Sequence, residues 1–339
     1  MHMADALLSP GTGGAMWLAS GVALAVASRR VGARADDRLV PLMGMLGAFV
    51  FAAQMINFTI PGTGSSGHLG GGLLLAILLG PHAAFVVIAS VLTVQALFFA
   101  DGGLLALGAN MFNLGVLPCL VAYPLIYRPL AGPRPSNRRV VLAAMAAAII
   151  GLQLGAIGVV MQTALSGISS LPLKTFLALM LPIHLAIGIV EGLATGAIVL
   201  FLRRTRPDLL SGSFAAGSVR TLLTGLALAA LLTGGVVSWF ASTQPDGLEW
   251  SVARAAGGEL ASPTQPGLHA RLANLQGRTA WFAGYGLPSF AAASPSPLRE
   301  TWPDVKPGTS LAGVVGGTTT LALILAVGWA LRRRRRARA

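Results

Sequence analysis

The sequence predicts an all-α fold: a polytopic membrane helix bundle of seven transmembrane helices, followed by a two-helix C-terminal module with a long outer loop. Composition is the first observation behind this prediction, because 54% of the residues are hydrophobic and 10% are charged, whereas soluble domains carry about 25% charged residues. The second is a series of long apolar runs, and the third is a set of arginine clusters at the ends of those runs. Together they exclude an ordinary soluble domain.

Nine apolar runs account for the predicted helices. A transmembrane helix needs about 20 mostly apolar residues, and suitable runs lie at about 14–28, 39–57, 82–100, 104–127, 139–166, 176–202, 219–240 and 311–331. A ninth run, at about 69–80, would reach only about 18 Å as a helix. It either extends through Pro81 and His82 or forms a half-helix buried in protein, where irregular backbone is tolerated. We count it as a crossing.

The basic residues test the count of nine membrane crossings, because lysines and arginines near membrane ends gather on the cytoplasmic side. With nine crossings and an outer N-terminus, 18 of the 24 lysines and arginines lie in cytoplasmic segments. Removing the run at 69–80 would place the cluster at 128–139 outside. We therefore expect a multi-pass membrane protein, with its N-terminus extracytoplasmic and its C-terminus cytoplasmic. These arginines face membrane lipid and lack interleaved aromatics, so they do not indicate nucleic-acid binding.

The chain is predicted to have two parts. Residues 1–205 form the first membrane domain, and 206–218 form a short basic cytoplasmic linker. Residues 219–339 form the two-helix module, whose outer loop at 241–310 is rich in Pro, Ser and Gly. We expect little regular structure over most of that loop. The single cysteine, Cys119, lies in an apolar run and is expected to be a packed core residue.

Two histidines suggest a metal site. His2 starts the chain and His68 ends a glycine-rich turn, and the predicted topology places both on the outer face. No cleavable signal peptide is apparent, so the mature chain is expected to begin at Met1. The Met1 amine, the His2 amide nitrogen and the His2 imidazole would then chelate one ion in fused five- and six-membered rings, and His68 would add a fourth nitrogen. Four nitrogens in a plane suit Ni(II) or Cu(II) better than Zn(II). The alternative is an arbitrary second residue and an ordinary loop histidine.

Polar side chains near these ligands form a possible supporting shell, because metal ligands are usually oriented by such neighbours. The candidates are Asp5, Gln54, Asn57 and Ser66. His184 and Glu191, seven residues apart on one predicted crossing, would also be costly to bury in a membrane without a role. For this pair we favour a clamp between helices over a second metal site.

Four segments carry a family resemblance: MHMADALLSP (1–10), QMINFTIPGTGSSGHLGGGLLLAILLGPHAAF (54–85), FFADGGLLALGANMFNLG (98–115) and HLAIGIVEGLATG (184–196). Over about residues 1–202 the chain resembles the cobalt/nickel substrate-binding membrane component of energy-coupling factor transporters. The resemblance implies that Met1, His2 and His68 bind the ion. Asp5 matches an early acidic residue of that family, although Ala6 stands where glycine is usual.

A second resemblance lies in the outer loop. PDGLEW (245–250) is similar to the signature of the small two-helix accessory component of the same transporters, here fused behind the receptor. Such a fusion is similar to nickel-type systems and favours nickel over cobalt. Asp246 and Glu249 either assist metal capture or shape the loop.

The resemblance implies a substrate-capture component of an ATP-driven importer in a bacterial or archaeal cell (inner) membrane. Such a component is not an enzyme, needs no resident cofactor, transports Ni(II) or Co(II), and associates with a transmembrane coupling subunit and cytoplasmic ATPase subunits. Neither of the two lysines, Lys174 and Lys306, completes a phosphate-binding G-x-x-x-x-G-K-[ST] loop. ATP hydrolysis is therefore expected in the partner subunits. The alternatives are a stand-alone divalent-cation channel or secondary permease, and a membrane metal sensor.

Overall fold

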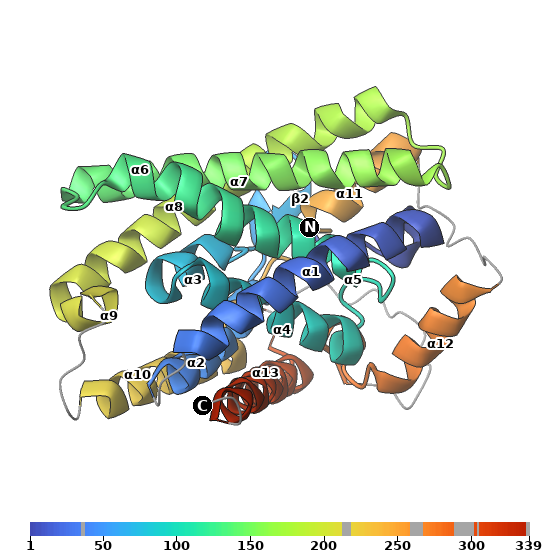
Figure 1. Ribbon diagram of the computed structural model, residues 1–339. Helices are drawn as coiled ribbons and strands as arrows, with labels where there is room; N and C mark the ends of the chain where they lie inside the picture. Colours follow the sequence, from blue (N-terminus) through green and yellow to red (C-terminus); the bar gives the residue numbers. More distant parts are fainter. Residues whose placement is uncertain (35–37, 212–217, 258–266, 288–301, 304, 337–339) are drawn as a thin grey trace.

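The computed structural model describes residues 1–34, 38–211, 218–257, 267–287, 302–303 and 305–336, and these residues are almost entirely helical (Figure 1). They confirm the predicted all-α membrane bundle. The sheet in the described part is a short antiparallel hairpin, β1 (Phe58–Ile60) and β2 (Ser65–Gly67).

The helices follow the apolar runs. In the N-terminal part they are η1 (Asp5–Leu7), α1 (Pro10–Arg34), α2 (Leu39–Gln54), α3 (Gly72–Leu79), α4 (Pro81–Phe99), α5 (Leu107–Met111), the π-helix η2 (Phe112–Tyr127), α6 (Arg128–Ala131), α7 (Asn137–Ser166), α8 (Leu173–Thr205) and α9 (Pro207–Ser211). In the C-terminal part they are α10 (Ser218–Gly235), η3 (Val237–Phe240), α11 (Gly247–Ala256), α12 (Leu268–Thr279), η4 (Ala283–Tyr285) and α13 (Pro307–Arg336).

Seven helical stretches in the described residues are long and apolar enough to cross a membrane. They are Pro10–Ala33, Pro81–Phe99, Leu107–Ala131, Asn137–Ser166, Leu173–Thr205, Arg220–Phe240 and Pro307–Arg333. Two of the nine predicted crossings are shorter, since α2 has 16 residues and α3 has 8. The orientation of the termini stays a prediction.

Of the two forms considered for the run at 69–80, the structure has the half-helix. Gly80 ends α3 with φ +80°, and Pro81 then begins α4 as a separate helix. Proline has no N–H to continue the hydrogen-bond ladder of a preceding helix, but it fits the first turn of a new one. The extension through Pro81 and His82 is therefore wrong. Six of the eight α3 residues are buried, so surrounding protein covers this interrupted backbone.

Glycine allows the helices to pack closely, as its abundance suggested. Gly188, Gly192 and Gly196 recur every fourth residue along the face of α8 that meets α7. A Cβ at Gly188 or Gly192 would lie 2.9 or 2.7 Å from an α7 Cα atom, so larger side chains would push the two helices apart. The pair runs side by side along one edge of the bundle (Figure 1).

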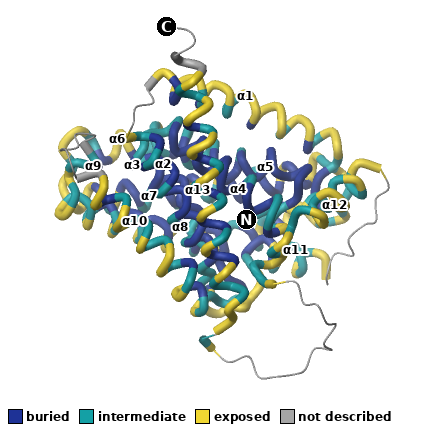
Figure 2. The backbone as a smooth tube through the Cα atoms, turned by 90° about the horizontal axis from the view of Figure 1, so that it is seen from below, coloured by how far each residue is buried: buried dark blue, intermediate teal, exposed yellow. Residues whose placement is uncertain are grey.

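The C-terminal module packs onto the N-terminal part. α10 and α13 both lie against α2 (Figure 1), and a Cβ at Gly316 of α13 would overlap the buried ring of Phe51. The interior around α4 and α5 is buried, while the outer faces of α1 and α12 are exposed (Figure 2). Many exposed side chains on the long helices are large and apolar, among them Leu18 and Phe201. A lipid-facing surface has this character.

Candidate metal centre

The first eight residues, here called the N-terminal hook, fold back into the bundle. Asn110 of α5 pairs with both polar groups of Met3: the Met3 N–H donates to Oδ1 (2.7 Å) and Nδ2 donates to the Met3 carbonyl (3.2 Å). The Asp5 carboxylate accepts a hydrogen bond from the backbone N–H of Ala106 (2.9 Å). Met1 and Met3 are buried as a result. The chain therefore starts in the middle of the bundle (Figure 1).

The segment 55–71, here called the glycine loop, carries His68 into the same region. Gly62 and Gly64 each have φ +77°, a conformation that favours glycine, and they turn β1 back onto β2. The ring of His68 lies just beyond β2. Its Nδ1 is 3.2 Å from the carbonyl oxygen of Leu69, which can only accept, so Nδ1 carries the hydrogen and Nε2 keeps a free lone pair.

Two helices hold the end of the glycine loop. The buried Glu191 carboxylate of α8 accepts from the N–H groups of Gly70 (2.9 Å) and Gly71 (3.2 Å). Gln54 of α2 donates to the Gly70 carbonyl (2.7 Å) and accepts from Gln95 of α4 (2.8 Å). Hydrogen bonds to a charged acceptor are among the strong ones. Glu191 thus fastens α8 to the glycine loop rather than to another helix, so its contacts differ from the clamp between helices expected for the His184–Glu191 pair.

The segment 245–249, PDGLE, joins the edge of the hairpin. The Ser66 N–H donates to the Pro245 carbonyl (2.8 Å), and the Ser66 hydroxyl donates to the Gln244 carbonyl (2.8 Å). Asp246 then caps α11 in a capping box with Glu249. Its Oδ1 accepts from the helix backbone, which leaves Oδ2 to accept from the Met1 ammonium at 2.8 Å. The first residue of the chain is therefore paired with the C-terminal module.

The rings of His2 and His68 are stacked, with centroids 5.2 Å apart and planes inclined by 16°. His2 Nδ1 lies 3.3 Å from Asp101 Oδ1, and Asp101 also accepts from the Tyr285 hydroxyl of η4. His2 Nε2 is buried and has no hydrogen-bond partner in the described part of the chain. The six-membered chelate expected from the sequence would use Nδ1. An ion bound there would have to replace Asp101 at that nitrogen.

Burial keeps both imidazoles neutral. It lowers the pKa of His2 below the ordinary value, against the opposing effect of Asp101. Burial, the neighbouring amine and His2 together lower the pKa of His68 to about 3. Burial alone would raise the pKa of Asp246, but the Met1 ammonium outweighs it and holds that pKa well below its usual range. Near neutral pH the site thus has two neutral imidazoles, one ammonium and a carboxylate.

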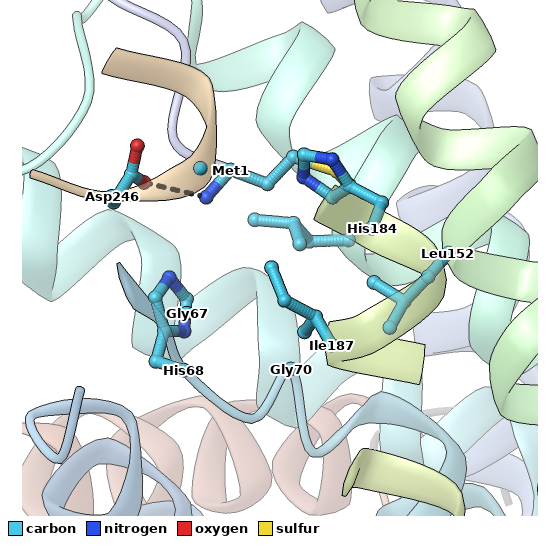
Figure 3. Close-up of a pocket in the computed structure, with 10 residues that line it drawn as sticks. Met1, Gly67, His68, Gly70, Leu152, His184, Ile187 and Asp246 are labelled. Atoms are coloured by element: carbon cyan, nitrogen blue, oxygen red, sulfur yellow. Dashed lines mark hydrogen bonds and ion pairs between the residues drawn. The ribbon is translucent and has the colours of Figure 1, made fainter. Parts of the chain in front are cut away.

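A small cavity adjoins these groups, and its lining includes Met1, His68, His184 and Asp246 (Figure 3). It has room for about one water-sized sphere, about 10 Å³. Among the described residues, no group of three or more His, Cys, Asp and Glu side chains is arranged to hold a metal ion. The ligand set expected from the sequence instead draws two of its four nitrogens from the backbone of Met1 and His2.

The structure places the predicted ligands Met1, His2 and His68 together, whereas the four supporting candidates hold segments of chain. Asp5 anchors the hook, Gln54 and Ser66 bind the glycine loop to its neighbours, and the Asn57 carbonyl accepts from the Ser242 N–H (2.7 Å). None of the four lines the cavity.

Sequence reasoning missed Asp101, the carboxylate nearest to His2. The signal was present in the FFADGG segment, where a single acid follows an apolar run. The sequence also left open whether Asp246 assists metal capture or shapes the loop. Its side chain pairs with the Met1 amine and also shapes the loop through the α11 cap.

Comparison with known proteins identifies two matching families. Residues 2–209 match the family described as cobalt uptake substrate-specific transmembrane region, and residues 220–333 match the PDGLE domain. These ranges meet near the short segment between α9 and α10.

Similar proteins are named as metal transporters. The chain is 31% identical to a fused nickel transport protein NikMN of Rhodobacter capsulatus, over 86% of this chain and 89% of that protein. It is 37% identical to a putative fused nickel transport protein NikMN of Archaeoglobus fulgidus, over 65% of this chain and 71% of that protein. A solved structure of a truncated transition metal transporter superposes with a TM-score of 0.54 at 33% identity, covering 60% of this chain and 99% of that one.

Proposed function

Because the chain belongs to the family of cobalt uptake substrate-specific transmembrane regions and continues into a PDGLE domain, we propose that it is the substrate-capture component of an ATP-driven nickel or cobalt importer. Its cargo ion is held by four nitrogens: the Met1 amine, the His2 amide and imidazole, and the His68 imidazole. Residues 1–205 form the receptor, and residues 219–339 form an accessory module that completes its site.

One observation carries this proposal: the buried Met1 amine lies at a small cavity with His68, whose ring is stacked on that of His2. Burying an ammonium and two imidazoles in a membrane protein is costly, so their convergence supports a ligand site. The amine and the adjacent amide form a five-membered chelate ring with one ion. The ion then takes the place of Asp101 at His2 Nδ1.

The donor set supports nickel over cobalt as cargo. A nearly planar set of strong nitrogen donors that includes a deprotonated amide suits Ni(II), whose d⁸ configuration favours square-planar coordination. The relative from Rhodobacter capsulatus, named as a nickel transporter, matches across both parts of the chain. Competition calorimetry with Ni(II) and Co(II) measures this preference, and tighter binding of Co(II) would reverse the assignment.

Transport requires partner subunits under this proposal. A transmembrane coupling subunit and two cytoplasmic ATPases supply the energy that exposes the site to the cytoplasm. Proteoliposomes that contain the chain alone should not accumulate Ni(II), and those that also contain the partners should do so only with ATP. ATP-independent uptake by the chain alone would instead support a channel or secondary permease.

The test of the metal site is to add two alanines before Met1, because a single added residue would put His2 third in the chain and create another four-nitrogen chelate from the amine, two amides and the imidazole. The extension moves the amine away from the His2 amide and changes no side chain of the parent sequence. We expect Ni(II) affinity, measured by calorimetry on the full chain, to fall by at least about a hundredfold, or about 2.7 kcal/mol. Intact mass should first confirm that Met1 is retained and unblocked in the parent protein.

The matched control is His82→Gln, which changes a histidine in the first turn of α4 that does not line the cavity and belongs neither to the N-terminal hook nor to the glycine loop. This variant should bind Ni(II) as the parent does. Equal affinity of the extended and parent proteins would remove the amine from the ligand set and with it the four-nitrogen site.

A further inference from the structure

His184 presents a bare nitrogen to the cavity beside the proposed ligands. It lies on α8, and its side chain is buried. Nδ1 is 2.8 Å from the Met180 carbonyl oxygen, and Nε2 has no hydrogen-bond partner in the described residues. Figure 3 shows the His184 ring projecting into the space occupied by Met1, across the cavity from His68.

The hydrogen bond to Met180 fixes the tautomer of this ring. A carbonyl oxygen can only accept, so Nδ1 carries the hydrogen and Nε2 has a lone pair. This is the usual state of a metal-ligating histidine, which donates its other ring N–H to a carbonyl or carboxylate and binds the ion with the opposite nitrogen. A histidine that only joined helices would bond through both nitrogens, because unpaired polar atoms are rare in protein interiors.

The surroundings of His184 link it to the proposed ion site. The same cavity is lined by Met1, His68 and Asp246. On the α11 side, a Cβ at Gly247 would lie 3.6 Å from His184 Cε1, so the PDGLE segment closes over this ring. Much of the remaining wall is apolar, including Leu114, Leu152 and Ile187. His184 Nε2 is thus a nitrogen donor that an ion meets on leaving Met1 and His68 for α8.

We propose that His184 is a transit ligand, whose Nε2 takes the cargo ion as it enters or leaves the four-nitrogen site. The inference rests on the proposed function. No group of three or more His, Cys, Asp and Glu side chains in the described residues could hold the ion independently, so binding at His184 is weak. Weak binding suits this role, because an ion in transit must be able to leave.

The test separates the two nitrogens of the ring. His184→Asn keeps an amide donor near the position of Nδ1, so the bond to Met180 is retained, and it removes Nε2. His184→Gln instead places an amide group near the position of Nε2, where its oxygen can meet the ion. Both variants are made in the full chain, and the release of bound Ni(II) to excess EDTA is followed by stopped-flow absorbance.

We expect H184N to release Ni(II) at least about tenfold more slowly than the parent, with equilibrium affinity little changed, and H184Q to recover most of the rate. A purely structural role would leave H184N at the parental rate, which would overturn the proposal. So would a loss of affinity in H184N together with faster release, because His184 would then belong to the resting site.

Failure of the proposed function is seen separately in the alanine-extended protein. If that protein binds Ni(II) as tightly as the parent, the four-nitrogen site is wrong whatever the rates of the His184 variants. If it does not, the H184N rate alone decides whether His184 is a transit ligand.

Discussion

Asp246→Asn tests how the C-terminal module supports the site. The Asp246 carboxylate lies 2.8 Å from the Met1 ammonium, and the two side chains are 18% and 3% exposed. Breaking a buried pair by removing one partner costs about 3–5 kcal/mol. Because the carboxylate keeps some contact with solvent, we expect the lower end of that range. Asparagine is an equally good helix N-cap, so the α11 cap should survive and the loss should report the charge.

The affinity for Ni(II) should change much less than the stability. Without metal, Asp246 faces the single positive charge of the Met1 ammonium. With metal, the ion's two positive charges are reduced to one by the deprotonated His2 amide. Asp246 therefore faces the same net charge in both states. We expect D246N to shift the Ni(II) affinity by less than about tenfold, or 1.4 kcal/mol.

Thermal unfolding of the full chain, with and without saturating Ni(II), measures the loss of stability. Calorimetry measures the change in Ni(II) affinity. A loss of about 3 kcal/mol should lower Tm by about 4 °C in both states. Because the folded-state pKa of Asp246 is lowered, the pair stabilises the protein above the ordinary aspartate pKa near 4. That stability is lost as the pH falls further, so the difference between parent and D246N should shrink below about pH 4.

The control is Glu249→Gln, one turn along α11, which should leave Tm within about 2 °C of the parent because glutamine can still complete the capping box. An unchanged Tm in D246N would show that the ion pair contributes nothing to stability. A fall in Ni(II) affinity of more than about a hundredfold at unchanged Tm would make Asp246 a direct ligand and refute the charge argument.

Three other outcomes are expected. Gly103→Ala would drive a Cβ into the Asp5 carboxylate and displace the N-terminal hook. Ni(II) binding measured by calorimetry should weaken by about tenfold or more. Parental affinity would show that the hook tolerates the shift. Asn110→Ala removes both hydrogen bonds to the Met3 backbone and should cost about 2 kcal/mol in thermal unfolding, whereas an unchanged Tm would mean that water replaces the amide. Since burial lowers the pKa of His68 to about 3 and also lowers that of His2, both imidazoles should be uncharged at pH 7, and each bound Ni(II) should release about two protons, from the amine and the amide. Calorimetry in two buffers of different ionisation enthalpy gives that number, and about four would mean that the histidines are charged before binding.

The apolar runs predicted the helices well because membrane burial demands length and hydrophobicity, both of which are local properties. The run at 69–80 was harder, since its end depends on the backbone of Gly80. The local signal, Gly80 followed by Pro81, was compatible both with a half-helix and with a helix that extends through Pro81. Proximity of His2 to His68 followed from topology, which places both on one face before any contact is known.

The charges around the site could not be predicted in the same way. Asp246 reaches the Met1 amine across 245 positions of sequence, and Asp101 reaches His2 only because the hook turns inward. Both contacts depend on how separate loops pack. Likewise, the sequence suggests a chelate through Nδ1 of His2, but the ring orientation is set by its carboxylate neighbour.

The pairing of Met1 with Asp246 also sets an order for biosynthesis. Residue 1 gains its counterion only after Asp246 has been added, 245 positions later, roughly 12 to 50 s at usual translation speeds. A formyl or acetyl group on Met1 would abolish the charge that Asp246 attracts, and the Asp246 carboxylate would then be buried without its partner.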